Sequence, residues 1–259
     1  MKHRSKTCKY FLNLLTVYAA VATGFAAELA GVKTNASAPL TWITGKRVLV
    51  VGGGSSHDFN RWFNAADVAT LRSSGGLSVN YTENSALTTR ELKEADVLVM
   101  STNQKNFDTP EFREALMQFA EAGKGLVLLH PAVWYNWPWP EYNRVLVGGD
   151  SRGHDRLGEF EVKILKQHPV TKGVASTFKI TDELYHFEPD ATGSTIEVLA
   201  RTSPSAEKVE YPSVWLVNHP KARIVCIAPG HDSRSHELPE FKRLLVNAVN
   251  WTARQEPDP

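Results

Sequence analysis

Short apolar runs that alternate with helical segments constrain the fold of this chain more than any other feature. Residues 48–51, 97–99 and 126–129 are continuous apolar runs, as strands buried on both faces require. Residues 59–69 repeat apolar side chains at helical spacing, and residues 109–123 form a second helical segment, with a threonine and a proline at its start and a glycine at its end. This alternation predicts a doubly wound α/β fold around a mostly parallel sheet.

The second half of the chain predicts strands without long helices between them. Residues 159–166, 177–181, 195–202 and 213–218 alternate or cluster side chains that are typical of strands. They indicate a β-rich continuation of the same domain. Residues 238–254 then place apolar side chains on one face of a closing amphipathic helix.

The first 26 residues have the three parts of a secretory signal peptide: four basic residues, an apolar stretch, and small residues that end at Ala26. The stretch is short for a membrane-spanning helix and contains polar residues. We therefore expect cleavage, export to the periplasm or the extracellular space, and no stable membrane insertion of the mature protein. The predicted organisation is a signal peptide (1–26), a linker (27–45), one α/β domain (46–254) and a disordered tail (255–259).

Charge and cysteine content exclude several function classes. The formal charge is +1, and removal of residues 1–26, with four basic and no acidic side chains, lowers it by four to −3. This balance gives no electrostatic reason to expect nucleic acid as a partner. Cys226 would be the only remaining cysteine, so we expect neither an internal disulfide nor a zinc site built on thiolates.

Three histidines define the candidate site, because His57, His130 and His231 each follow the end of a predicted strand. Open parallel sheets bind ligands beyond the carboxyl ends of their strands, so we expect the three imidazoles to converge there. Asp58 and Asp232 directly follow two of the histidines, where a carboxylate can orient an imidazole or add an oxygen ligand.

Further candidates come from the middle of the chain. Glu183 and Tyr185 alternate along an extended segment and therefore point to the same side. His154 falls in a glycine-rich run that predicts a loop. Imidazoles and carboxylates can perform acid–base chemistry near neutral pH. They can equally bind zinc, manganese or iron, so a divalent metal cofactor stays an open alternative.

An aromatic segment offers a sugar platform, because flat rings cover the apolar face of a sugar while its polar rim stays free for hydrogen bonds. Trp134, Tyr135, Trp137 and Trp139 lie close together there, among stiffening prolines. The alternative is that these rings only seal the domain.

Four segments carry a family resemblance: VLVVGGGSSHDF from residue 48, GLVLLHPAVW from residue 125, HPVTKG with FKITDELY from residue 168, and APGHDSRSHELPEFKRLLVNAVNW from residue 228. Together they resemble the trehalose-utilisation (ThuA-like) family, over nearly the whole range from Arg47 to Ala253. The resemblance implies the class I glutamine amidotransferase-like superfamily, whose fold is a flavodoxin-like three-layer sandwich. It also implies a role in sugar catabolism, with trehalose, related glycosides or keto-sugars as substrates.

The chain departs from the amidotransferases of that superfamily where their chemistry takes place. By this resemblance, His130 would stand at the strand-to-helix elbow that carries their nucleophilic cysteine, and no acid stands two residues beyond His231. Cys226 lies within a predicted strand and is expected in the core. We therefore do not expect glutamine hydrolysis.

These observations lead us to expect a hydrolase or lyase that acts on a small carbohydrate. His130 and His231 would be its central imidazoles, Glu183 a carboxylate partner, and His57 a ligand or base. The expected substrate-binding residues are Asp58, Trp134, Tyr135, Trp137, Trp139, His154, Tyr185 and Asp232. Two alternatives stay open: a carbohydrate-binding protein without catalysis, and a histidine-based metalloenzyme with another substrate. The oligomeric state is not indicated.

Overall fold

The computed structural model describes residues 38–102, 107–205 and 208–255. The predicted signal peptide, the first part of the predicted linker and residues 256–259 of the predicted tail lie outside these ranges. The chain divides into two compact units, Met1–Ala38 and Pro39–Pro259, and the elements given below belong to the second. Within the described residues, no helix combines the length and apolar character needed to cross a membrane.

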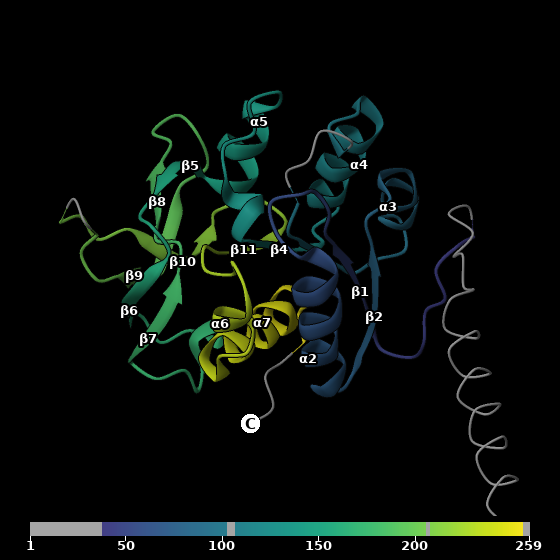
Figure 1. Ribbon diagram of the computed structural model, residues 1–259. Coiled ribbons are helices and arrows are strands. Elements are labelled where there is room, and N and C mark those ends of the chain that lie inside the picture. Colours follow the sequence, from purple (N-terminus) through teal and green to yellow (C-terminus); the bar gives the residue numbers. More distant parts are fainter. Residues whose placement is uncertain (1–37, 103–106, 206–207, 256–259) are drawn as a thin grey trace, which may run out of the picture. The chain divides into compact units, whose positions relative to one another are not determined.

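One mixed sheet organises the fold (Figure 1). In spatial order its nine strands are β2 (Leu77–Thr82), β1 (Lys46–Val51), β3 (Val97–Met100), β4 (Gly125–Leu129), β11 (Arg223–Ile227), β10 (Pro212–Val217), β9 (Ile196–Thr202), β6 (Gly158–Ile164) and β7 (Thr177–Asp182). The strands from β2 to β11 pair in parallel, and the pairs from β11 to β7 are antiparallel. A separate antiparallel ladder joins β5 (Gly149–His154) and β8 (Tyr185–Pro189).

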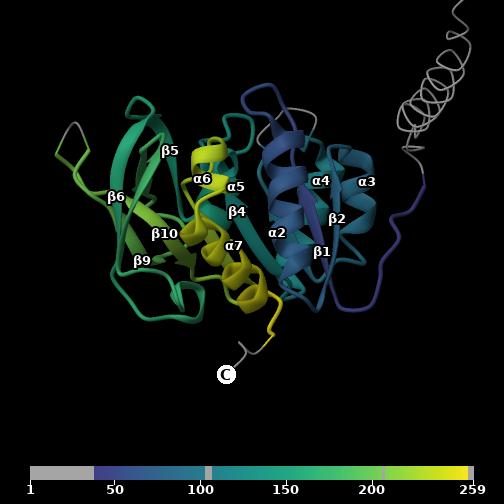
Figure 2. The ribbon, with the colours of Figure 1, turned by 60° about the horizontal axis from the view of Figure 1, so that its bottom comes forward.

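Helices cover both faces of the parallel strands (Figure 2). The π-helical turn η1 (Asn60–Asp67) continues into α2 (Val68–Ser73), which packs on one face beside the closing helix α7 (Pro239–Thr252). The other face carries α3 (Ser85–Glu91) and α4 (Pro110–Glu121). Short turns complete the set: η3 (His130–Val133), α5 (Pro140–Tyr142), η4 (Asn143–Val147), η5 (Pro169–Thr171) and α6 (Ser233–His236). The predicted α/β sandwich with a β-rich second half is confirmed.

Alternating side chains explain the two core layers. Along β1, Val48 and Val50 pack on the side of α2 and α7, whereas Leu49 and Val51 pack on the side of α4. All four side chains have no exposed surface. Burial on both faces explains why the sequence shows a continuous apolar run there instead of an alternating pattern.

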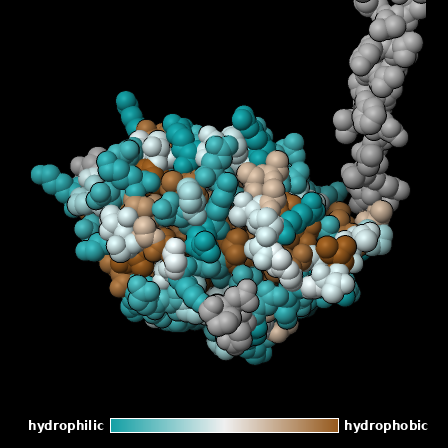
Figure 3. Space-filling view, turned by 90° about the horizontal axis from the view of Figure 1, so that it is seen from below, coloured by the Kyte–Doolittle hydropathy of each residue, from teal (hydrophilic) through white to brown (hydrophobic). Residues whose placement is uncertain are grey.

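The surface of the described residues carries few large exposed hydrophobic side chains: Ile43, Trp137, Leu157, Leu165 and Val209. They are spread along the chain, and the face seen from below mixes hydrophilic residues with smaller hydrophobic areas (Figure 3). Scattered exposed hydrophobic residues of this kind are ordinary on a folded domain.

The sheet topology determines where a site can form. Strands β1, β4 and β11 are parallel, so the loops that follow them leave the sheet at the same edge. The turn between β7 and β8 reaches this edge from the antiparallel half, because the Asp182 carboxylate at the end of β7 accepts a hydrogen bond from Gly230 N, 2.8 Å away in the loop after β11.

Candidate functional site

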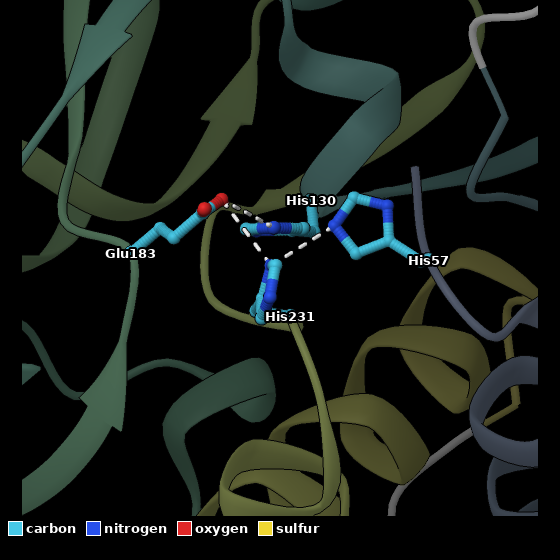
Figure 4. Close-up of side chains that lie close together, drawn as sticks. All are labelled: His57, His130, Glu183 and His231. Carbon is cyan, nitrogen blue, oxygen red and sulfur yellow. Dashed lines mark hydrogen bonds and ion pairs between the residues drawn. The ribbon is translucent and has the colours of Figure 1, made fainter. Parts of the chain in front are cut away.

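Three histidines and one glutamate lie together where the strands end (Figure 4). His57 Nε2 is 3.1 Å from His231 Nδ1. Glu183 Oε2 is 3.3 Å from His231 Nδ1 and 3.5 Å from His130 Nε2. One nitrogen or oxygen from each of the four side chains lies within 4.8 Å of the other three, and we call these four residues the tetrad. The predicted convergence of the three histidines is confirmed.

His130 forms the floor of the tetrad, and its side chain is fully buried. The residue ends the extended run of β4 and opens η3, with a backbone φ of +36°. Its Nδ1 lies 2.7 Å from the carbonyl oxygen of Ala228, which can only accept, so Nδ1 donates and carries the proton. In the neutral ring Nε2 is then an acceptor, 3.2 Å from the hydroxyl of Tyr185, whose ring stacks on His130 with 4.4 Å between centroids.

Asp182 holds Glu183 and His231 beside one another. One carboxylate oxygen of Asp182 accepts hydrogen bonds from the backbone N–H groups of Gly230 and His231, at 2.8 and 3.2 Å, and from the hydroxyl of Ser235. The other oxygen accepts from Glu183 N at 2.7 Å. This fully buried carboxylate thus joins the β7–β8 turn to the loop after β11.

A second buried acid lies beneath the loop after β11. Asp67 Oδ1 is 2.7 Å from His236 Nδ1, and His236 Nε2 donates to the carbonyl oxygen of Gly230 at 3.0 Å. Both side chains are buried. This pair therefore supports Gly230 from below, next to His231.

The tetrad has an uneven distribution of charge. Burial and the neighbouring His130 and His231 lower the pKa of His57 to about 3, so His57 is neutral at physiological pH. A hydrogen bond that His231 donates to the Glu183 carboxylate raises the pKa of His231. Burial alone would raise the pKa of Glu183, but its contacts with His130 and His231 outweigh burial and lower it well below the ordinary value. Glu183 is therefore the anionic member of the tetrad.

A pocket of about 280 Å³ opens above the tetrad, and we call it the site pocket. Its lining consists of Ser56, His57, Pro131, Trp134, His154, Glu183, Tyr185 and His231. The ring of Trp134 meets Tyr185 edge-on at 5.1 Å and His154 at 5.8 Å. His154 Nδ1 donates to the carbonyl oxygen of Asp155 at 2.8 Å, which leaves Nε2 as an acceptor in the neutral ring.

The prediction that His154 lies on a loop is wrong. The residue is the last one of strand β5. The glycine-rich run that predicted the loop has another structural role. Gly149 adopts a φ of +155°, and a side chain there would collide with the backbone of β8. Glycine in this strand therefore permits close approach of the partner strand.

Five residues expected to bind substrate lie outside the lining of the site pocket: Asp58, Tyr135, Trp137, Trp139 and Asp232. Asp58 and Asp232 instead accept hydrogen bonds from the backbone N–H groups of Arg61 and Arg234 at the starts of helices.

The aromatic side chains predicted to bind sugar also lie partly inside and partly outside the lining of the site pocket. Trp139 is 5% exposed and packs on Tyr142, whereas Trp137 is 68% exposed and contacts Tyr135. Only Trp134 of this segment lines the site pocket. Composition alone does not reveal which ring of the segment faces the pocket.

Sequence reasoning did not single out Ser56, Pro131, Asp182 or the Asp67–His236 pair. Ser56 Oγ lies 2.8 Å from His57 Nδ1, and its place directly before His57 was an available signal. Asp182 likewise precedes Glu183. Nothing in the sequence pairs Asp67 with His236, because the two residues are 169 positions apart.

The arrangement supports two kinds of chemistry. The carboxylate of Glu183 and the imidazoles around it can exchange protons with a molecule in the site pocket. The same four side chains offer nitrogen and oxygen ligands of the kind that borderline divalent metals bind.

The structure is thus an α/β sandwich with a histidine-rich cluster at the strand ends. The family model described as ThuA, trehalose utilisation, matches residues 47–252. The chain belongs to this family. No curated protein matches the sequence.

Solved structures share the fold at low sequence identity. A ThuA-like protein from Parabacteroides merdae ATCC 43184 matches with a TM-score of 0.69 and 20% identity, over 81% of this chain and 90% of that one. A cytoplasmic protein from Salmonella typhimurium LT2 matches at 0.59 and 12%, over 80% and 99%. A glutamine amidotransferase from Thermotoga maritima matches at 0.51 and 10%, over 82% and 100%. These likenesses show the ThuA and amidotransferase-like fold.

Proposed function

We propose that this protein is an enzyme that performs acid–base chemistry on a small carbohydrate bound in the site pocket. The observation that carries the proposal is the Glu183 carboxylate, which lies between two imidazoles at the base of a pocket with aromatic walls. Trehalose or a related glycoside is the substrate class, in keeping with the description of the family.

Proton transfer follows from the charges of the tetrad. His57 is neutral at pH 7 because its pKa is lowered to about 3, so it can accept a hydrogen bond or act as a ligand but does not act as an acid. His231 has a raised pKa and a carboxylate partner in Glu183, which suits it to donate a proton. His154, with its acceptor nitrogen and partial exposure, serves as a base at the pocket wall.

Sugar recognition follows from the walls and the size of the pocket. Trp134 and Tyr185 offer flat rings beside polar groups, a combination that suits the apolar face and hydroxyl rim of a pyranose. At about 280 Å³, the pocket is at the small end of the roughly 300–1,000 Å³ usual for ligand sites. It therefore holds one sugar unit, and the remainder of a glycoside extends outward.

The proposal is tested by incubating the protein with trehalose and a panel of other glucosides and following products by NMR. We expect turnover of at least one glucoside. Glu183→Gln keeps the shape of the side chain but removes the anion, so we expect turnover to fall by about 100-fold or more, the usual contribution of acid–base catalysis.

A matched pair of tryptophan variants tests sugar recognition. Trp134→Ala should weaken binding of the sugar by roughly 1 kcal/mol or more, because its ring lines the pocket. Trp137→Ala removes a ring of the same kind from the surface outside the pocket and should leave binding unchanged. Isothermal titration calorimetry with the sugar gives both affinities.

Two outcomes would replace the proposal. Sugar binding without turnover would indicate a carbohydrate-binding protein on the same fold. Equal losses in the Trp134 and Trp137 variants would place the sugar elsewhere on the molecule.

A further inference from the structure

We propose that His57, His130, Glu183 and His231 bind one divalent metal ion of the zinc type at the base of the site pocket. The inference deepens the proposed function at the same site and rests on it for the use of the ion in catalysis. Binding of the ion is carried by the geometry of the tetrad alone.

The separations between the tetrad atoms fit a metal ion. A tetrahedral zinc ion with bonds of about 2.0–2.1 Å holds its ligand atoms about 3.3 Å apart. The three short separations in the tetrad are 3.1, 3.3 and 3.5 Å. The remaining separations stay within 4.8 Å, so small side-chain rotations suffice to close the site around an ion.

In the neutral ring of His130, Nε2 is unprotonated, which is the form that a metal ion binds. Its Nδ1–H donates to the Ala228 carbonyl, so in the neutral ring the lone pair of Nε2 faces the tetrad. A backbone carbonyl bound to the second nitrogen is the common outer partner of a metal-binding histidine, since it fixes the tautomer and the ring orientation.

His57 also has an outer partner on its second ring nitrogen, in this case a serine hydroxyl. Its Nδ1 bonds to Ser56 Oγ at 2.8 Å, and its Nε2 points to the tetrad. Asp182 supplies the outer support for the other two ligands, because it fixes the backbone N–H groups of both Glu183 and His231.

Hydrogen bonding alone leaves part of this arrangement unexplained. One proton satisfies the contact between His57 Nε2 and His231 Nδ1. The Tyr185 hydroxyl can donate to His130 Nε2, but in the neutral ring His130 Nε2 and the Glu183 carboxylate oxygen then face each other as two acceptors, 3.5 Å apart, and repel each other. A shared cation removes this repulsion, and among the described residues no Lys or Arg side chain lines the site pocket.

The ligand set selects the class of metal. Three imidazole nitrogens and one carboxylate oxygen suit zinc, cobalt, nickel or iron, whereas magnesium and calcium prefer oxygen ligands. His130 is fully buried below, and the other three ligands line the site pocket. The ion thus faces the pocket, where it can polarise a sugar oxygen as a Lewis acid.

The test is metal binding by protein from the full sequence, stripped with a chelator and then titrated with Zn²⁺ against a chromogenic competitor. We expect one tight equivalent per chain. X-ray absorption should show about four nitrogen or oxygen ligands near 2.0–2.1 Å with imidazole scattering. His231→Gln and Glu183→Gln should each lower the affinity by more than the roughly 10–100-fold that loss of an outer partner costs.

His186→Ala is the matched control, because His186 lies next to Tyr185 but bonds to Asp155 outside the tetrad. It should bind Zn²⁺ as the wild type does. The inference is overturned if the folded wild type binds no stoichiometric Zn²⁺, or if His231→Gln and Glu183→Gln bind it unchanged. Circular dichroism on each variant excludes loss of the fold as the cause of lost binding.

The same samples separate this inference from the proposed function. If the stripped protein converts sugar and takes up no Zn²⁺ in the titration, the metal site is overturned and the proposed sugar enzyme stands. If the protein binds Zn²⁺ tightly but neither binds nor converts any sugar, the metal site stands and the proposed function is overturned.

Discussion

His130 combines complete burial with a backbone φ of +36°, a region that residues other than glycine adopt with strain. The extended Leu129 precedes it and Pro131 follows it, so the chain turns sharply at this one residue. The turn directs the imidazole into the space beyond the strand ends. Strain at a site residue of this kind is typical of functional positions.

This backbone predicts an unusual order of stability for two variants. At ordinary strand positions glycine is less stable than alanine by about 0.5–1 kcal/mol, because it loses more conformational freedom on folding. At position 130 glycine relieves strain of about 1–2 kcal/mol that alanine retains. We therefore expect His130→Gly to be at least as stable as His130→Ala in urea unfolding.

His186 in strand β8 provides the comparison, and there the usual order should hold. If glycine is clearly the less stable residue at both positions, the backbone of His130 is not strained.

Residue by residue, the sequence was informative where a side chain follows a strand. His57, His130 and His231 were found because the ends of parallel strands share one edge of the sheet. Trp137 and Trp139 were misplaced, because a cluster of rings in the sequence does not say which ring faces a pocket. Asp182 was missed, because its importance comes from backbone donors that are 48 or more positions away.

At the scale of elements, the connection between β7 and the loop after β11 matters most for the site. Asp182 accepts hydrogen bonds from two backbone groups of that loop and from Ser235, and it also holds the N–H of Glu183. These two segments carry two of the four tetrad residues. A change in this connection should therefore disturb the site as well as the stability of the fold.

Asp182→Asn tests this connection. The amide replaces one acceptor oxygen with a donor that faces other donors, so we expect the free energy of unfolding to fall by about 3 kcal/mol. Ser235→Ala removes a single contact and should cost about 1 kcal/mol. Chemical denaturation measures both, and equal small losses would show that Asp182 is not the central link.

The elements of the first half were predictable, because buried parallel strands and the helices between them have distinct patterns. Strand β5 was not, because Gly149 serves close packing against β8, whereas a glycine-rich run in the sequence predicts a loop. The π-helical form of η1 was not foreseen either, since the same apolar spacing is compatible with an ordinary helix.

At the scale of the whole molecule, the buried Asp67–His236 pair joins η1 to α6, although the two residues are 169 positions apart in the chain. Burial opposes protonation of His236, but the Asp67 carboxylate outweighs burial and raises the His236 pKa. Burial raises the pKa of Asp67 as well. The folded state therefore holds a proton on this pair to higher pH than the unfolded chain does.

The direction of the pH effect follows. A raised histidine pKa stabilises the fold fully below the unfolded value of 6.5, and this stability is lost as pH rises through the folded pKa. We expect the free energy of unfolding of the wild type to decline above pH 6.5 relative to His236→Gln, by at most about 1.4 kcal/mol per pH unit. Urea unfolding at a series of pH values provides the comparison. Parallel profiles for the two proteins would contradict the prediction.

Export through residues 1–26, the linker boundary and the disordered end of the chain stay predictions of the sequence. Most of the residues concerned lie outside the described ranges.

The two halves of the sheet contribute unequal numbers of residues to the tetrad. The parallel half provides the three histidines through loops that also end core strands, whereas the single carboxylate comes from the short turn between β7 and β8. Exchange of that turn and of Tyr185, the first residue of β8, would alter the acid and the hydroxyl without touching the strands that position the histidines. A change confined to residues 183–185 would therefore replace the acid and the neighbouring hydroxyl while the three histidines stay in place.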